Sequence, residues 1–330
     1  MPEDRLVIGV DIGGTKIAAG VVDGSGAILH QTRTPMAAKA GADAGLAAVI
    51  AAINSVAPKA GKAGAAKSCG IGLCAPGPLD PEAGVIINPP NLPCWRNYPL
   101  AAAIEGALGV PVKLDNDGNA AALAEARWGA GRGYKNVFYA TIGTGIGTGI
   151  VLDGRIYHGR TGAAAEGGHV SIDYRGPVCG CGKRGCIEAL AAGPAIARRA
   201  RSKLAEGRPS AIRELAGDKL EAVSSEMVSR AFAQGDPVAR EILLETVELL
   251  AFWLGNMVDL LEPDIVVFGG GVATMLSPLM DGLRQRLPGC CINSRCQEIP
   301  LVMARYGSDA GIAGGAALCS VAPAANRAGK

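Results

Sequence analysis

The pattern that most limits the folds open to this chain is a strand, a glycine turn and a second strand, and it occurs twice. The first copy, LVIGVDIGGTKIAAGVVDGSG, covers residues 6–26, and the second, NVFYATIGTGIGTGIVLDGRI, covers residues 136–156. Each copy reads as a short buried strand, a glycine-rich turn, another strand and an Asp-Gly hairpin signal. Two such patterns, each beginning an α/β segment, predict two α/β domains of related design with a ligand cleft between them.

Further strands and helices are expected after each copy. Strands are expected in residues 68–78, 111–119 and 264–273, and helices in residues 45–56, 99–109, 120–131 and most of 194–262. Residues 1–117 are predicted to form a small domain, completed by a C-terminal helix at about 309–322. Residues 118–308 are predicted to form a large domain that carries a metal site. The tail from Pro323 to Lys330 is expected to fray.

Composition excludes several classes of protein. Of 330 residues, 49% are hydrophobic but only 4% are aromatic, so the cores must be built from Ala, Val, Leu and Ile. A formal net charge of +2 gives no field suited to nucleic acid or to an anionic membrane. No apolar run has the length of a signal peptide or a membrane span. The sequence is therefore typical of a cytoplasmic protein, in which the ten cysteines would stay reduced.

Glycine turns at strand ends indicate a phosphorylated ligand. In DIGGTK, residues 11–16, the glycines let the backbone approach an oxyanion, the threonine and lysine add donors, and Asp11 could hold a hydrated Mg²⁺. The turn at residues 143–147 fits neither the dinucleotide motif nor the P-loop motif. A third turn follows at residues 269–271. An ordinary hairpin turn would explain the glycines of DIGGTK, but one long phosphorylated ligand explains all three turns.

Six motifs make the chain resemble the ROK family of sugar kinases and repressors. In order they are DIGGTK, LDNDGNAAALAE, TIGTGIGTGIV, AAAEGGH, CGCGKRGCIEA and VVFGGGVA, and the likeness runs from about residue 6 to 318. The resemblance implies the actin-like ATPase (ribonuclease H-like) fold, ATP as the nucleotide and a homodimer. It also implies that the first two turns bind the nucleotide phosphates and that the third lies by the adenosine. The implied nucleotide-binding residues are Asp11, Gly13, Gly14, Thr15, Lys16, Thr144, Gly145, Gly269, Gly270 and Gly271.

Soft metal ligands gather in GHVSIDYRGPVCGCGKRGCIEAL, residues 168–190. The resemblance assigns Zn²⁺ to His169, Cys179, Cys181 and Cys186. The chemistry agrees independently, because one imidazole and three thiolates close a tetrahedral site with no open position, which is typical of structural zinc. The alternative is a set of reduced, buried cysteines without a metal.

Carboxylates beside these ligands are implied to bind the sugar. In the family's pattern Glu166 and Glu188 hydrogen-bond sugar hydroxyls, while His169 binds zinc with one ring nitrogen and offers the other to the sugar. A solvated helix residue is the other interpretation of Glu188. The chain departs from the pattern at Ala165, where Gly is common, and at Gly167, where an apolar residue is common. These departures leave the sugar preference open.

The run DNDGN, residues 115–119, contains the expected catalytic base. Phosphoryl transfer needs in-line positioning, charge neutralisation by Mg²⁺ and a residue that accepts the hydroxyl proton. Asp117 matches the family's catalytic aspartate, and Asn116 would orient a sugar hydroxyl. Asp115 is the competing candidate for the base. Capping of the following helix by Asn116 or Asp117 is the structural alternative.

The resemblance therefore implies an ATP-dependent hexose kinase that transfers the γ-phosphate of Mg-ATP to the 6-hydroxyl of glucose. Residues 75–95, APGPLDPEAGVIINPPNLPCW, look like the sugar-side loop of the glucokinase branch, with Gly77, Pro78 and Asn91 in place. Sugar binding is expected to close the cleft and bring the hydroxyl on C6 beside Asp117.

Other functions are open to a chain of this kind. A kinase for N-acetylmannosamine, N-acetylglucosamine or fructose would keep the same mechanism, whereas a sugar sensor would bind without turnover. A repressor is not expected, because the first phosphate loop begins at residue 11 and leaves no room for a helix-turn-helix domain ahead of it. A zinc hydrolase is not expected either, because it needs an open coordination position and the four ligands leave none. A second metal site at Cys290, Cys291 and Cys296 is not favoured, since no histidine is near them.

Overall fold

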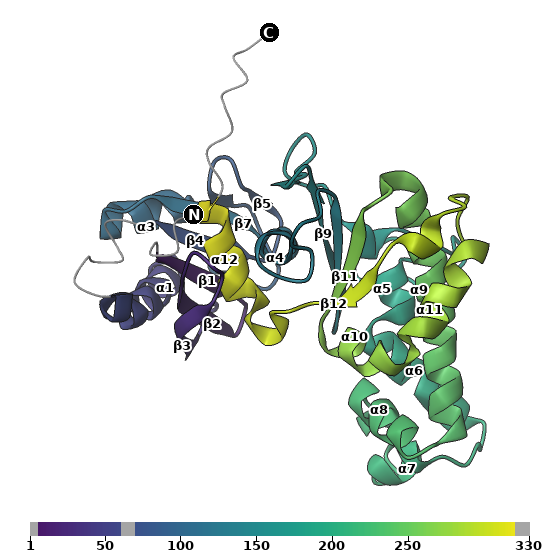
Figure 1. The fold of residues 1–330 in the computed structure, drawn as a ribbon. Helices are drawn as coiled ribbons and strands as arrows, with labels where there is room; N and C mark the ends of the chain where they lie inside the picture. The colour runs from purple at the N-terminus through teal and green to yellow at the C-terminus, as the bar shows by residue number, and fades with distance from the viewer. Residues whose placement is uncertain (1–5, 61–69, 321–330) are drawn as a thin grey trace. The chain divides into compact units, whose positions relative to one another are not determined.

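The computed structural model describes residues 6–60 and 70–320, which fall into two compact units (Figure 1). One unit is made of Met1–Lys135, Gly149–Ala165 and Arg305–Lys330, and the other of Asn136–Thr148 and Glu166–Ala304. This grouping differs from the expected boundary after residue 117, because the helix that starts there packs inside the first unit. Within the described ranges, no helix combines the length and apolarity needed to cross a bilayer.

A five-stranded sheet lies at the centre of the first unit, in the order β3-β2-β1-β4-β7. β1 pairs antiparallel with β2 and parallel with β4, and β7 continues the parallel side. The strands are β1 (Val7–Ile12), β2 (Lys16–Val22), β3 (Ile28–Pro35), β4 (Ile71–Ala75) and β7 (Val112–Asn116), with a separate hairpin of β5 (Leu79–Asp80) and β6 (Val85–Ile86). The helices are α1 (Ala42–Val56), α3 (Leu100–Leu108), α4 (Asp117–Arg127) and α12 (Ala310–Ser320).

Side chains of β1 contribute to apolar cores on both faces of this sheet. Ile8, Val10 and Ile12 lie in one buried cluster with residues of α1 and α3. Val7 lies in a second cluster, with residues of α4 and α12. Because successive side chains of a strand point to opposite faces, a strand covered on both faces reads as an apolar run without polar alternation. This explains why the opening of the chain is recognisable as a buried strand.

Helix α12 comes so close to the sheet that the strand residues beneath it must be glycine. A Cβ atom on Gly9 would lie 1.8 Å from the carbonyl oxygen of Ile312, and one on Gly72 would lie 1.7 Å from that of Gly315. No side chain fits at such distances. The helix covers residues 310–320 of the expected 309–322 and belongs to the first unit. The tail that we expected to fray lies outside the described residues.

The second sheet repeats the strand order of the first. Its order is β10-β9-β8-β11-β12, so in both sheets the first strand has its hairpin strands on one side and two later strands on the other. β11 runs parallel to β8 and to β12, as β4 does to β1 and β7. The strands are β8 (Val137–Ile142), β9 (Ile146–Leu152), β10 (Arg155–Ile156), β11 (Ile265–Gly269) and β12 (Leu301–Met303). The duplicated α/β layout expected from the two sequence patterns is confirmed.

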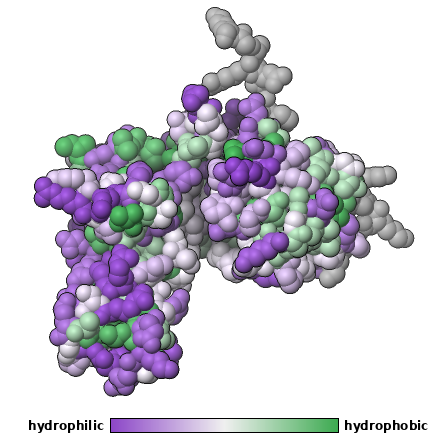
Figure 2. All heavy atoms as spheres, turned by 180° about the vertical axis from the view of Figure 1, so that it is seen from behind, coloured by the Kyte–Doolittle hydropathy of each residue, from purple (hydrophilic) through white to green (hydrophobic). Residues whose placement is uncertain are grey.

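The second unit contains seven described α-helices. They are α5 (Ile187–Ala191), α6 (Gly193–Ala205), α7 (Ala211–Leu215), α8 (Ser225–Ala233), α9 (Pro237–Leu261), α10 (Gly271–Leu276) and α11 (Met280–Arg286). Of these, α6 to α9 make up most of residues 194–262, as expected. α9 starts after Asp236, whose Oδ1 accepts a hydrogen bond from the Ala239 amide at 2.8 Å. It buries Trp253 against Phe138 of β8, with ring centroids 5.7 Å apart. Figure 2 shows hydrophilic side chains over much of one face of the molecule, with hydrophobic ones in separate groups.

Candidate functional site

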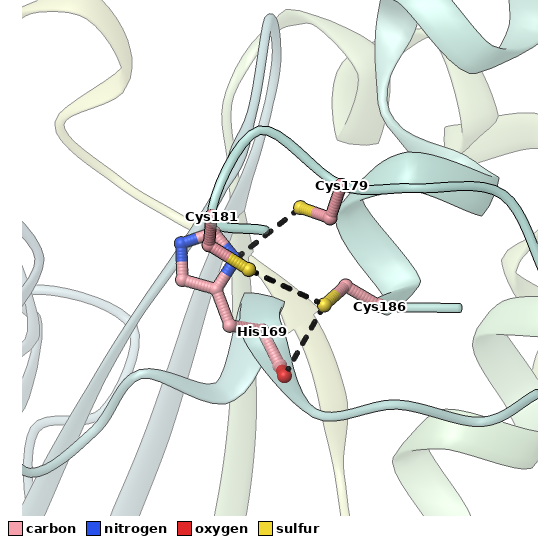
Figure 3. A group of neighbouring side chains, drawn as sticks. All are labelled: His169, Cys179, Cys181 and Cys186. Atoms are coloured by element: carbon pink, nitrogen blue, oxygen red, sulfur yellow. Dashed lines mark hydrogen bonds between the residues drawn. The ribbon is translucent and has the colours of Figure 1, made fainter. Parts of the chain in front are cut away.

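Four soft ligands converge in the second unit. The ligand atoms of His169, Cys179, Cys181 and Cys186 all lie within 4.8 Å of one another (Figure 3). His169 Nδ1 lies 3.7 Å from the Cys179 sulfur, and the sulfurs of Cys181 and Cys186 are also 3.7 Å apart. The structure therefore brings together all four of the expected metal ligands.

The spacing and chemistry of this group fit a tetrahedral divalent metal. With Zn–S bonds of about 2.3 Å, the edge of a tetrahedron between two sulfurs is about 3.8 Å, close to the separations observed. Burial and the neighbouring thiols raise the pKa of Cys186 to about 12. Three thiolates packed this closely would repel one another unless a cation balanced their charge, and a zinc-like ion does this.

Two glycines pack the segment that carries His169 against strand β9. His169 ends a short 3₁₀ helix, η2 (Gly167–His169). The Gly167 amide donates to the Thr148 hydroxyl at 2.8 Å, and its carbonyl accepts from the indole nitrogen of Trp253 at 2.9 Å. A Cβ atom on Gly168 would lie 1.8 Å from the carbonyl oxygen of Ile146. A Cβ atom on Gly167 would lie 2.8 Å from the Thr148 hydroxyl oxygen, so the packing is close at both glycines but is limited by backbone only at Gly168.

Ala165 is the other departure, and its backbone is unusual. It has φ of 67°, in the left-handed region that an alanine side chain disfavours by about 1–2 kcal/mol. Glycine has no such penalty, which accounts for the preference for glycine at this place in the pattern. Glu166 follows directly, and its carbonyl accepts from the His169 amide at 3.0 Å.

Glu188 links the metal-ligand group to the second glycine turn. Its Oε2 accepts from the Ile146 amide at 2.9 Å. Its Oε1 lies 3.6 Å from the Cys179 sulfur and 3.9 Å from His169 Nδ1. One carboxylate oxygen is therefore bound to the turn, while the other faces the ligand group. A solvated helix residue does not describe these contacts, and sugar binding by Glu188 stays a prediction.

A pocket of about 990 Å³ opens beside the second and third glycine turns. Its wall includes Gly143 and Thr144 of the second turn and Gly271 of the third turn, all within the second unit. Helix α8 supplies the opposite wall, with Ser225, Ser229 and Arg230 among its side chains. This volume suits a ligand of nucleotide size. The α8 wall could not be recognised from the sequence, because a helix face that bears serine and arginine is typical of a solvated surface.

The first glycine turn lies in the other unit, beside the expected sugar-side loop. A Cβ atom on Gly14 would lie 2.5 Å from the carbonyl oxygen of Asn91, so the turn touches that loop. The Gly13 amide donates to the Lys16 carbonyl at 2.9 Å, which closes the turn. Burial raises the pKa of Asp11, and Lys16 opposes this shift.

The expected catalytic run stands where β7 ends and α4 begins. Asn116 caps the helix, since its Oδ1 accepts from the amides of Gly118 at 2.9 Å and Asn119 at 3.4 Å. Its Nδ2 faces Gly77, where an added Cβ would lie 3.6 Å away. Asp117 Oδ1 accepts from the Gly118 amide at 2.8 Å. Capping thus accounts for Asn116, while a catalytic role for Asp117 stays a prediction.

Asp115 is buried and bound on both carboxylate oxygens. Its Oδ2 lies 2.6 Å from Nε2 of His158, and its Oδ1 accepts from the Asn116 amide at 2.7 Å and from Asn119 Nδ2 at 3.2 Å. A carboxylate engaged in this way is a poor candidate for the base. His158 could not be identified from the sequence, because a single histidine between Tyr157 and Gly159 forms part of no recognisable motif.

Comparison with known proteins places the chain in a family. The family model described as ROK family matches residues 7–321. A glucokinase from Thermotoga maritima is 35% identical over 318 residues, which are 96% of this chain and 98% of that protein.

Two solved structures are similar over most of the chain. A ROK family glucokinase from Streptomyces griseus, in complex with glucose and AMPPNP, is 35% identical with a TM-score of 0.76, covering 95% of this chain and 98% of that one. A ROK hexokinase from Thermus thermophilus is 38% identical with a TM-score of 0.77, covering 95% and 97%. The expected actin-like α/β fold is confirmed by these neighbours. The chain therefore belongs to the ROK family.

Proposed function

We propose that this chain is an ATP-dependent glucokinase, which transfers the γ-phosphate of Mg-ATP to the 6-hydroxyl of glucose. A pocket of nucleotide size with two glycine turns in its wall carries this proposal. The relatives support the choice of reaction, because they include glucokinases aligned over nearly their whole length. Glucose is the acceptor that we propose, and other hexoses are outcomes of the test below.

The nucleotide would occupy the pocket of the second unit. We propose that its adenosine lies between α8 and residues 269–271, with Thr144 and Gly145 at the phosphates. Backbone amides of a glycine turn can approach phosphate oxygens closely because no Cβ intervenes. In the first turn, Thr15 and Lys16 would add donors, and Asp11 would hold Mg²⁺ through water. Neutralising the phosphate charge in this way is the main requirement of phosphoryl transfer.

The acceptor hydroxyl would lose its proton to Asp117. Asp115 cannot easily serve instead, since His158, Asn116 and Asn119 already occupy its oxygens. We propose that Asn116 orients the hydroxyl through its Nδ2, which does not take part in the helix cap. Further sugar contacts are proposed for Gly77, Asn91, Glu166, His169 and Glu188.

The metal proposed for His169 and the three cysteines is structural zinc. Four protein ligands leave no position for substrate, so the ion would shape the loop and would not polarise the sugar. His169 would keep Nε2 free for a hydroxyl, because Nδ1 is the nitrogen that faces the thiols. The protein is also proposed to act as a cytoplasmic homodimer.

An ADP-release assay tests the reaction. Glucose, N-acetylmannosamine, N-acetylglucosamine, mannose and fructose should be compared with Mg-ATP. A clear preference for glucose supports the proposal, whereas preference for an acetamido sugar keeps the mechanism and changes the acceptor. An absence of turnover with all five sugars, in protein that contains its metal, contradicts the kinase proposal.

Replacing the proposed base separates chemistry from binding. Asp117→Asn should lower kcat by about 10²–10⁴-fold, the usual range for loss of a general base, with glucose affinity nearly unchanged by calorimetry. Asp43→Asn, on the exposed side of α1, is the matched control and should keep the wild-type kcat. Wild-type turnover in Asp117→Asn would show that another group accepts the proton.

A further inference from the structure

His158 and Asp115 form a close pair behind the run that holds the proposed base. His158 Nε2 lies 2.6 Å from Asp115 Oδ2. The aspartate side chain is only 4% exposed, whereas the histidine side chain is 36% exposed. His158 follows β10, and Asp115 lies near the end of β7, so the pair joins two segments of the first unit that are distant in sequence.

The other oxygen of Asp115 fixes the backbone of the catalytic run. Oδ1 accepts from the Asn116 amide at 2.7 Å and from the Asn119 side chain at 3.2 Å. These bonds span the junction at which β7 becomes α4, and Asp117 is the first residue of that helix. Any rotation of the Asp115 carboxylate would therefore disturb both residues proposed to meet the acceptor hydroxyl.

Negative charge gathers at this place. Cys74 lies opposite Asp115 in the neighbouring strand β4, and its thiol is buried. Burial is the main cause that raises the pKa of this thiol well above its ordinary value. The negative charges of Asp11, Asp117 and Asp115 raise it further. The thiol thus stays neutral. His158 supplies a compensating positive charge when it is protonated, and its hydrogen bond to Asp115 raises the pKa of His158, against the opposing effect of burial.

We infer that His158 is a positioning residue for phosphoryl transfer, which holds Asp115 in place so that Asn116 and Asp117 keep the geometry needed at the acceptor hydroxyl. This inference rests on the proposed kinase function.

The inference predicts a pH dependence of kcat with a definite sign. Since the pKa of His158 is raised above its ordinary value of about 6.5, the charged pair is complete below that value. The pair is lost as pH rises through the raised value, so kcat should decline on the alkaline side.

Two substitutions of His158 test the inference. His158→Ala removes the partner of Asp115, and kcat should fall by about 10–100-fold, as expected for a small misplacement of catalytic groups, while KM for ATP stays unchanged. His158→Gln can still donate a hydrogen bond to Asp115 but cannot titrate. Because it is uncharged at every pH, its kcat should equal the lower, alkaline value of the wild type, lie above that of His158→Ala, and show no alkaline decline. His30→Gln, on the exposed edge strand β3, is the matched control and should keep the wild-type profile.

The outcomes separate this inference from the proposed function. Turnover in the wild type, together with unchanged kcat and an unchanged pH profile in His158→Ala and His158→Gln, would overturn the role of His158 alone. Equal losses of kcat in both variants, with the alkaline decline retained, would also overturn it, because the histidine would then be merely structural. If the wild type phosphorylates none of the sugars, the kinase proposal itself fails.

Discussion

Single glycines decide whether the metal-ligand group can form. Gly168 is the sharpest case, because an added methyl group would lie 1.8 Å from the carbonyl oxygen of Ile146. That oxygen belongs to the backbone of β9 and cannot rotate away. Gly168→Ala should therefore lower the free energy of unfolding by about 1–3 kcal/mol or more, the range for overpacked sites. Urea denaturation measures this loss directly.

A second glycine in the same segment provides the control. Gly180 stands between Cys179 and Cys181, and an added Cβ there would meet no atom within 4 Å. Gly180→Ala should change the stability by less than about 0.5 kcal/mol, as surface substitutions usually do. If both variants were equally stable, the close packing of Gly168 against β9 would not hold in solution.

At the scale of elements, we expect residues 168–190 to depend on the proposed metal for their order. The segment contains little regular structure: within it, isolated bridges join Ser171 to Cys186 and Val178 to Arg184, and α5 begins only at Ile187. Its other backbone hydrogen bonds belong to turns and loops, such as that from the Cys179 amide to the Lys183 carbonyl. We expect one zinc ion per chain by atomic absorption, and faster proteolysis of this segment after chelation, since metal binding and folding are coupled in such loops.

Cys181 is the best ligand for a test of that dependence. Its side chain is exposed, so Cys181→Ser removes a ligand while disturbing little packing. The variant should lose zinc and become as sensitive to protease as the chelated wild type. Cys290→Ser is the matched control, because the described residues place Cys290 outside any group of metal ligands. Zinc retained at one ion per chain in Cys181→Ser would contradict a four-ligand site.

For the whole molecule, ion pairs predict how stability changes with pH. Arg208 and Lys203 hold the pKa of Glu241 down to about 2. Because this value lies below the ordinary glutamate value, the group stabilises the fold above about pH 4.3. Its contribution disappears as pH falls toward 2. His158 acts with the opposite sign, so its contribution is lost as pH rises.

Thermal melts of Glu241→Gln should show this dependence. The wild type should melt at a higher temperature than the variant at pH 6, and the difference should vanish near pH 2. Glu248→Gln, on the exposed side of the same helix α9, is the control. A difference that stayed constant down to pH 2 would mean that Glu241 is not paired as described.

Much of this molecule could be predicted from its sequence, for physical reasons that differ by region. The strands of both sheets could be predicted, because strands covered on two faces are apolar runs and each glycine turn stands at a strand end. The grouping of His169, Cys179, Cys181 and Cys186 was expected from the family resemblance, and the structure brings these four side chains together. Contacts made by unremarkable residues could not be predicted. His158 meets Asp115 from 43 residues away, and α8 forms a pocket wall without any motif. The first domain also extends beyond the expected boundary at residue 117, because α4 packs on α12, and this contact joins segments far apart in the sequence.

The fit of α12 over Gly9 and Gly72 has a consequence for synthesis. On the ribosome, β1 and β4 are made early, whereas the helix that covers them is the last of the described elements to emerge. Until then α4 alone packs on that face of the sheet, and Gly9 and Gly72 lack the helix that lies over them. The unit that begins with the first residues is therefore completed by the last described helix.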